Sequence, residues 1–145
     1  MNSFQTVLLV LNALWFGIAF HYFFFKSAAA AKLLIPKAQR ETPLFETQAS
    51  SLRFLGTMNL ALASLALLLL FNASMFSQRG QWALFAVVFA VAHGGQFYCN
   101  VPVALKNRTA EPGVWPVLKG PMRVIFVVDA SLMLANAVLA AMLLI

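Results

Sequence analysis

Charged residues are scarce in this sequence. Asp, Glu, Lys and Arg make up 10% of its 145 residues, whereas hydrophobic residues make up 62%. A soluble domain has roughly a quarter of its residues charged, so this chain lacks the polar surface that a soluble globule needs. The composition therefore predicts an integral membrane protein. The net charge of +6 does not indicate nucleic-acid binding, because no soluble domain is present to carry such a site.

Cysteine is almost absent as well. The single Cys99 excludes an intramolecular disulfide and a cysteine cluster for zinc or iron–sulfur. The sequence also has no nucleophile motif, no glycine loop of the kind that binds phosphate and no carboxylate-rich metal site. We therefore expect no metal, and the sequence leaves open whether the protein is an enzyme.

The sequence does contain four long apolar runs, each close to the roughly 20 residues that a helix needs to cross a bilayer. They cover residues 6–25, 51–71, 82–100 and 122–145. Strand periodicity is absent and the runs are too long for barrel strands, so we expect helices. The first run is too long for the apolar part of a signal peptide and no basic residue precedes it, so we expect it to be retained. The prediction is one all-α domain over residues 1–145, an antiparallel four-helix membrane bundle.

Basic residues are distributed unevenly between the connections. Only Arg79 lies in the second connection, and nine others lie in or beside the first and third. The positive-inside rule then predicts that the first and third connections are cytoplasmic and that both termini are on the other side. Compact loops and the lack of a sorting tail favour the bacterial inner membrane. The nine residues are Lys26, Lys32, Lys37, Arg40, Arg53, Lys106, Arg108, Lys119 and Arg123.

The first connection has features of its own. Residues 26–41 combine helix formers, three lysines and an apolar stripe, with an interruption at Pro36. This pattern fits a helix in the membrane interface whose lysines reach lipid phosphates. It fits equally a solvated basic connector that only sets the topology. In the third connection, Trp115 is expected to anchor the chain at the interface.

Small and polar residues recur at helical spacing in the two middle runs. Small residues mark close approach of helices in membranes, so we expect both stripes to face the bundle centre and the Phe-rich faces to meet lipid. The stripe of the second run is Gly56, Asn59, Ala63 and Ala66. The stripe of the third run is Ala83, Ala86, Ala90, His93, Phe97 and Asn100.

Polar residues also gather at one depth. His93, Gln96 and Asn100 share one helix face. Counted at 1.5 Å per residue from the expected helix ends, His93 lies roughly 6–12 Å inside the basic side of the membrane, and each other helix offers a polar residue at a similar depth. Those residues are His21, Asn59 and Asp129. The other half of the bundle is expected to be drier, with Asn12, Ser64 and Asn136 as exceptions. This favours a pocket open to the cytoplasm over a channel or transporter, which needs polar groups across the whole membrane.

Asp129 is the only acid within an apolar run. An intramembrane charge is costly unless it is paired, and such residues are functional by default. Asp129 can pair with His93 or His21, pair with Arg53 or Arg123, or stay protonated. It either serves a ligand or proton site with His93, or ties two helices together.

A haem held between His21 and His93 is a weaker alternative. Two histidines on parallel helices can bind the iron from both sides, and glycines adjoin or lie near them at Gly17 and Gly94. Two histidines alone are little evidence for such a site, and His21 fits a place at the headgroup level among aromatic residues.

Three stretches resemble the small four-helix membrane scaffold family of ergosterol biosynthesis. They are QASSLRFLGTMNLALAS, VAHGGQFY and GVWPVLKGP, and the resemblance covers about residues 49–120. That family has an Arg-x-Phe-Gly-like opening to its second helix and a His-Phe pair late in its third. This chain departs from the pattern where the family has an acid after that pair, since Gln96, Phe97 and Asn100 stand here. The resemblance implies a tethering subunit for lipid-modifying enzymes that has no catalysis of its own.

Two classes of function follow from these observations. In the first, the protein is an accessory or scaffold subunit that packs against larger membrane partners or copies of itself, surrounded by membrane lipid. In the second, it is a small membrane enzyme or binding protein for a lipid-like amphiphile, with His93 and Asp129 as acid and base. Apolar aromatic walls and a basic mouth would suit such a molecule.

Overall fold

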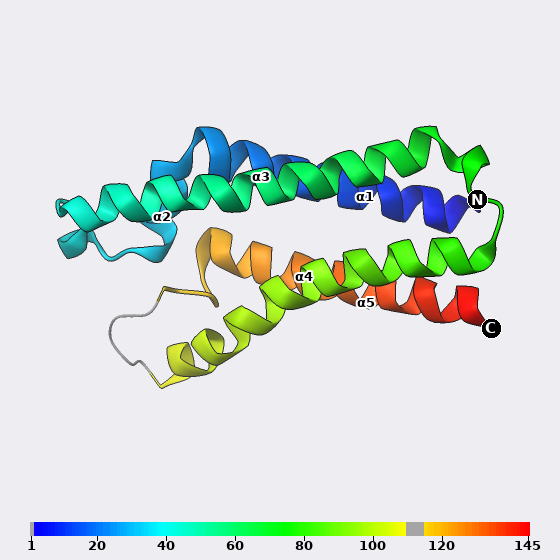
Figure 1. The fold of residues 1–145 in the computed structure, drawn as a ribbon. Helices are drawn as coiled ribbons and strands as arrows, with labels where there is room; N and C mark the ends of the chain where they lie inside the picture. Colours follow the sequence, from blue (N-terminus) through cyan, green and yellow to red (C-terminus); the bar gives the residue numbers. More distant parts are fainter. Residues whose placement is uncertain (1, 110–114) are drawn as a thin grey trace.

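The computed structural model describes residues 2–109 and 115–145, and all regular structure in them is helical. Four helices are long and apolar enough to cross a membrane, which agrees with an integral membrane protein. A π-helical turn over His21–Phe25 continues the first of them, and both termini lie at the opposite end of the molecule from the short helix α2 (Figure 1). The helices are α1 Ser3–Phe20, α2 Ser27–Leu34, α3 Pro43–Phe71, α4 Arg79–Arg108 and α5 Gly120–Leu144.

The middle helices are longer than the apolar runs that predicted them. α3 begins at Pro43 instead of residue 51, and α4 continues to Arg108 instead of ending at Asn100. Pro43 is at the first helical position, where a missing N–H costs nothing. Hydropathy measures only the part of a helix that suits lipid, whereas the helix itself continues as long as its backbone hydrogen bonds do. α4 even passes through Pro102.

Side-chain caps fix where α1 begins and where α2 ends. The Asn2 side chain accepts a hydrogen bond from the Gln5 backbone at 2.9 Å, and the Gln5 side chain accepts one from the Asn2 backbone at 2.6 Å, which forms a capping box. α2 stops before Ile35, whose extended backbone is what a following proline imposes. Arg40 then donates to the carbonyls of Lys32 and Ile35 at the end of α2. The first connection thus contains a short helix, α2, which packs against α3. The segment 110–114 of the third connection lies outside the described residues.

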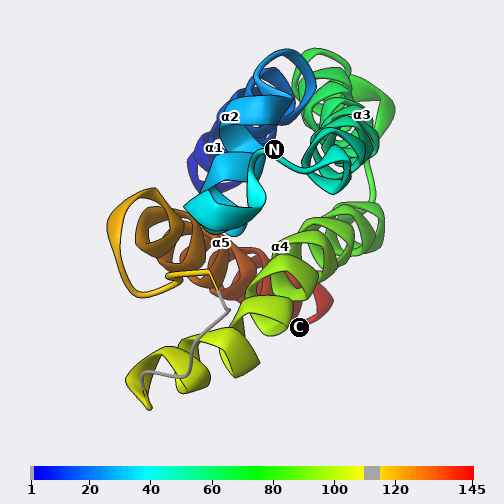
Figure 2. The ribbon, with the colours of Figure 1, turned by 90° about the vertical axis from the view of Figure 1, so that its left-hand side faces the viewer.

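The long helices pack as two pairs. The backbones of α4 and α5 approach each other most closely, as do those of α1 and α3. Side chains fill the space between the two pairs, where Phe16 of α1, Ala66 of α3 and Phe89 of α4 belong to one buried cluster. The end view shows the two pairs one above the other (Figure 2). The stripe predicted for α3 is buried throughout. Of the stripe predicted for α4, Ala83, Ala86 and His93 are buried and the other members are half-buried.

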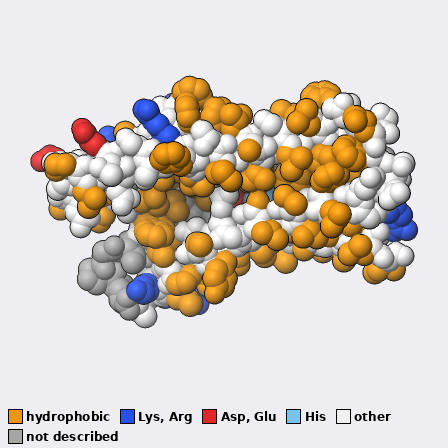
Figure 3. Space-filling model, viewed as in Figure 1, with side chains coloured by type: hydrophobic (Ala, Val, Ile, Leu, Met, Phe, Trp, Pro, Cys, Tyr) orange, Lys and Arg blue, Asp and Glu red, His pale blue; other side chains and the backbone are white. Residues whose placement is uncertain are grey.

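Apolar side chains cover the outside of the helices. Phe54, Met58 and Phe71 on α3 are among many large apolar residues that are exposed. In the space-filling view, hydrophobic side chains extend over the length of the molecule, and Lys and Arg gather toward its ends (Figure 3). We refer to the end with both termini as the terminal end and to the end with α2 as the basic end.

Candidate functional site

His93 and Asp129 form a buried pair at the centre of the molecule. His93 of α4 places Nδ1 3.0 Å from Oδ1 of Asp129 on α5, and both side chains are 0% exposed. Of the partners that the sequence allowed for Asp129, the structure provides His93. Neither side chain therefore reaches the surface of the molecule.

Three residues of α1 and α5 extend this pair into a network. Trp15 of α1 donates its indole N–H to Asp129 Oδ1 at 2.9 Å. His93 Nε2 lies 2.9 Å from Asn12 Oδ1. The side-chain amides of Asn12 and Asn136 form two hydrogen bonds with each other. Asn12 Nδ2 donates to Asn136 Oδ1 at 3.1 Å, and Asn136 Nδ2 donates to Asn12 Oδ1 at 3.2 Å. The network therefore connects α1 of one helix pair to α4 and α5 of the other.

The hydrogen bonds determine which ring nitrogen of His93 carries a proton. Asn136 Nδ2 donates to the Leu132 carbonyl at 2.8 Å, which fixes the orientation of that amide. Asn136 Nδ2 also donates to one atom of the Asn12 amide, so that atom must be the oxygen. The same oxygen faces His93 Nε2. Nε2 is therefore the donor and carries a hydrogen.

A hydrogen bond between His93 Nδ1 and Asp129 Oδ1, which lie 3.0 Å apart, needs one further proton. With Nε2 protonated, a single proton between Nδ1 and Oδ1 gives either an imidazolium with a carboxylate or a neutral imidazole with a carboxylic acid. Both forms have a net charge of zero, which is the condition under which such a pair is tolerated in a membrane interior. Phe16 stacks on the imidazole with ring centroids 4.5 Å apart, and Oδ2 of Asp129 is buried without a hydrogen-bond partner.

The other predicted site residues lie outside this network. Asn59 is buried on α3. Its Nδ2 donates to the backbone carbonyl of Leu55, one turn earlier in the same helix, at 2.7 Å, and its Oδ1 has no hydrogen-bond partner among the described residues. Asn100 accepts a hydrogen bond from the Trp115 indole at 3.0 Å. Gln96 is half-buried and lines a groove described below. The expected layer of one polar residue from each helix is thus only partly present, because a similar depth does not place residues on facing sides of their helices.

His21 is the clearest departure from that layer. It is exposed, belongs to the π-helical turn and packs beside Phe25 with ring centroids 5.7 Å apart. His93 uses both ring nitrogens in hydrogen bonds. The two histidines consequently do not form a haem clamp. Among the described residues, no three His, Cys, Asp or Glu side chains cluster as metal ligands would.

Asn12, Trp15 and Asn136 were not predicted as site residues. Asn12 and Asn136 were assigned to the drier half of the bundle. In the structure their side chains form hydrogen bonds with each other, and Asn12 also forms one with His93. A signal was present in the sequence, because Asn136 follows Asp129 by seven residues and Asn12 follows Gln5 by seven, which places each pair on one helix face. Trp15 gives no such signal.

A groove opens beside the network toward the basic end. It has a volume of about 540 Å³ between α1, α2 and α5, and its wall is almost wholly apolar or aromatic. Leu33 and Pro121 line both this groove and a second cavity of about 480 Å³, so the two adjoin. The adjoining cavity carries Lys32, Arg40 and Lys119. We call the two together the basic-end groove, and the second its mouth.

Trp15 separates the basic-end groove from the buried pair. Its indole N–H bonds to Asp129 while its side chain lines the groove, and neither His93 nor Asp129 lines it. The geometry thus has an apolar binding surface with cations at one end, and a proton-sharing pair behind an aromatic wall.

Comparison with protein-family models, with curated proteins and with solved structures gives no match to this chain.

The resemblance to the ergosterol scaffold family therefore stays a prediction. The function is therefore inferred from the arrangement of the side chains. An acid–base role of His93 and Asp129 on a bound molecule requires that the molecule touch them. As the side chains stand, a molecule in the groove touches Trp15 instead. Binding is therefore better supported than catalysis.

Proposed function

We propose that this protein binds an anionic membrane lipid in the basic-end groove, with an acyl chain along the apolar wall and the phosphate headgroup at the mouth. The observation that carries the proposal is that an apolar groove adjoins a mouth lined by three cations. The main groove falls within the 300–1,000 Å³ typical of small-molecule sites.

The charges at the mouth support an anionic headgroup. Lys32 and Lys119 are exposed and form no ion pair with a described residue. Arg40 is held in place by its bonds to the carbonyls at the end of α2. A basic residue near a membrane surface contributes about 1 kcal/mol to the attraction of anionic lipid.

The proposed orientation follows from the same charges. Nine of the ten basic residues lie in or beside the first and third connections. We therefore propose an antiparallel bundle in the bacterial inner membrane, with the basic end cytoplasmic and both termini on the other side.

Reversal of the two free charges at the mouth tests the binding site. The double variant Lys32→Glu, Lys119→Glu is expected to weaken binding of phosphatidylglycerol at least about tenfold, since each lysine contributes about 1 kcal/mol and reversal adds repulsion. Binding is measured by native mass spectrometry of the purified protein with added phosphatidylglycerol or phosphatidylcholine, and the wild type should prefer phosphatidylglycerol.

The matched control is Lys26→Glu, Arg108→Glu. It makes the same change in net charge with two exposed residues that do not line the groove, and it should bind phosphatidylglycerol as the wild type does. Equal losses in both double variants would show a general charge effect and reject the mouth as the site. A wild type that binds neither lipid would reject the proposal.

The accessory or scaffold role is the alternative proposal. Its support is the exposed apolar face of α3, which includes Phe54, Met58 and Phe71 and is available to a protein partner as well as to lipid. A larger membrane protein that co-purifies in a fixed ratio, together with no bound phosphatidylglycerol, would favour this role.

A further inference from the structure

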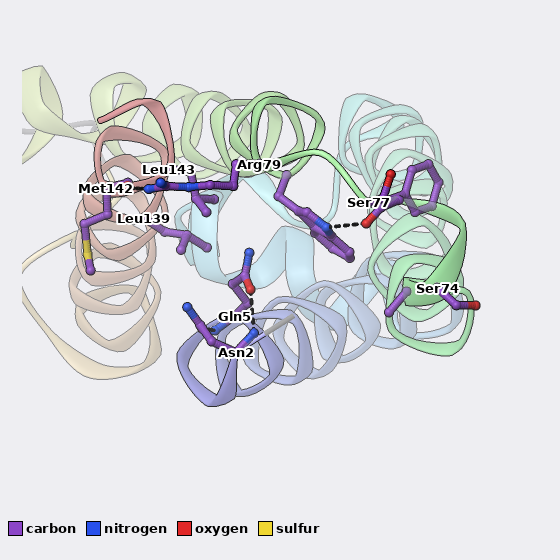
Figure 4. Close-up of a pocket in the computed structure, with 11 residues that line it drawn as sticks. Asn2, Gln5, Ser74, Ser77, Arg79, Leu139, Met142 and Leu143 are labelled. Carbon is purple, nitrogen blue, oxygen red and sulfur yellow. Dashed lines mark hydrogen bonds between the residues drawn. The ribbon is translucent and has the colours of Figure 1, made fainter.

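A second cavity opens at the terminal end, on the other side of the polar network from the groove. Its volume is about 600 Å³, and the start of α1, the start of α4, the end of α5 and the segment between α3 and α4 enclose it. Figure 4 shows the Gln5 side chain reaching into this space from α1 and the Arg79 side chain lying across it toward Met142. Arg79 donates a hydrogen bond to the Met142 backbone carbonyl at 2.8 Å. We call this cavity the vestibule.

A much smaller cavity continues from the vestibule toward the network. The two share Gln5, Trp82 and Leu139 as lining residues, so they adjoin. The inner cavity has a volume of about 10 Å³, which is close to the minimum that one water molecule occupies. Its walls are mostly apolar, but Asn12 and Asn136 lie at its inner side.

The polar atoms around the inner cavity have unused hydrogen-bonding capacity that one water would fill. Gln5 is 4% exposed, and its Nε2 makes no hydrogen bond with a described residue, because only its oxygen serves the cap. Asn12 Nδ2 uses one of its two N–H groups, on Asn136 Oδ1, and that oxygen accepts only this bond. A water beside the amide pair can accept from Asn12 Nδ2 and donate to Asn136 Oδ1, and Gln5 supplies a polar side chain where the inner cavity meets the vestibule.

The inner cavity also ends next to the proton-sharing pair. Asn12 Oδ1, which accepts the His93 Nε2 hydrogen, belongs to the same amide that faces the cavity. On the opposite side, the Trp15 side chain closes the network off from the basic-end groove. Among the described residues, the inner cavity thus approaches His93 from the terminal end, through the Asn12 amide.

We propose that the inner cavity holds one water molecule and that the vestibule and this water form a water access route to His93, closed at its inner end by the Asn12–Asn136 amide pair. The Nε2 hydrogen of His93 exchanges with solvent when that pair opens. The route is independent of whether a lipid occupies the basic-end groove.

Exchange of the His93 Nε2 hydrogen tests this route. The full-length protein is labelled with 15N-histidine and studied by NMR in lipid nanodiscs, where His21, the only other histidine, is assigned with His21→Gln. Gln5→Met removes the polar side chain that lines both the vestibule and the inner cavity and should slow exchange at least about tenfold, while Asn136→Ala removes half of the closing pair and should speed it at least about tenfold.

One control variant separates the route from effects at the basic end. Ala19→Leu narrows the basic-end groove and should leave exchange unchanged. The proposal is overturned if Gln5→Met and Asn136→Ala both exchange at the wild-type rate, or if Ala19→Leu slows exchange. A water cross-peak to the Asn12 side-chain amide in the wild type tests the bound water without any variant, and its absence would reject the water site.

Discussion

Replacement of Asp129 by asparagine will lower the free energy of unfolding by about 1–3 kcal/mol, although the two side chains have nearly the same shape. The reason lies in Oδ1 of Asp129. This one atom faces His93 Nδ1 at 3.0 Å and accepts the Trp15 indole N–H at 2.9 Å. Only an acid satisfies both neighbours in either position of the shared proton.

An asparagine cannot satisfy both neighbours. If its oxygen takes the place of Oδ1, it accepts from Trp15 but faces an unprotonated Nδ1 of neutral His93, and no hydrogen remains to join them. If its nitrogen takes that place, it donates to His93 but meets the Trp15 N–H with another N–H. Either way one buried polar group loses its partner, and such a loss costs about 1–3 kcal/mol. Asp129→Ala should cost more, because it strands both neighbours and leaves a cavity.

Unfolding by steric trapping in bicelles measures this effect, because it gives free energies in a lipid environment. Ser131→Ala is the matched control two residues away on α5. Ser131 is exposed, and its hydroxyl donates only to the backbone carbonyl of Val127, one turn earlier in α5. The expected change in the free energy of unfolding is therefore under about 0.5 kcal/mol. An Asp129→Asn protein as stable as the wild type would contradict the assignment of the shared proton and of the Trp15 contact.

Hydropathy and residue spacing predicted the four spans and the buried stripe of α3, because both depend on local periodicity alone. They also limited Asp129 to a paired or a protonated state, since an unpaired intramembrane charge is costly. The choice of His93 among the candidates was not determined by the sequence. It depends on how α4 and α5 are rotated about their axes, and small differences in rotation and tilt are set by packing against the other helices.

The basic-end groove could not be predicted in its details for a related reason. Its wall joins Trp15 and Phe23 to Val124 of a distant helix, and the short helix α2 contributes Leu33. Only the position of α2 brings Lys32 next to Lys119 at the mouth. The sequence showed that cations gather on one side, but contact between segments so far apart in the chain follows from tertiary packing.

Gly56→Ala will lower the free energy of unfolding by about 1–3 kcal/mol, although it adds a single methyl group. Gly56 was predicted to mark a close approach of helices, and the structure places it against the π-helical turn. A Cβ atom at position 56 would lie 2.9 Å from the Phe24 backbone nitrogen, 3.0 Å from Phe24 Cβ and 3.1 Å from Phe24 Cα. These atoms belong to or adjoin the main chain and cannot rotate away, so either α3 or the turn must shift. The same unfolding assay measures the loss.

Gly17→Ala is the matched control for this substitution. Gly17 also lies in a membrane-spanning helix, but a Cβ there would meet nothing within 4 Å. Because alanine loses less backbone entropy than glycine in a helix, Gly17→Ala should be neutral or more stable by up to about 1 kcal/mol. The opposite signs expected for the same chemical change separate a steric effect of the Phe24 contact from any general effect of added apolar volume. Equal stabilities for the two variants would mean that α3 does not approach the π-helical turn as closely as the structure has it.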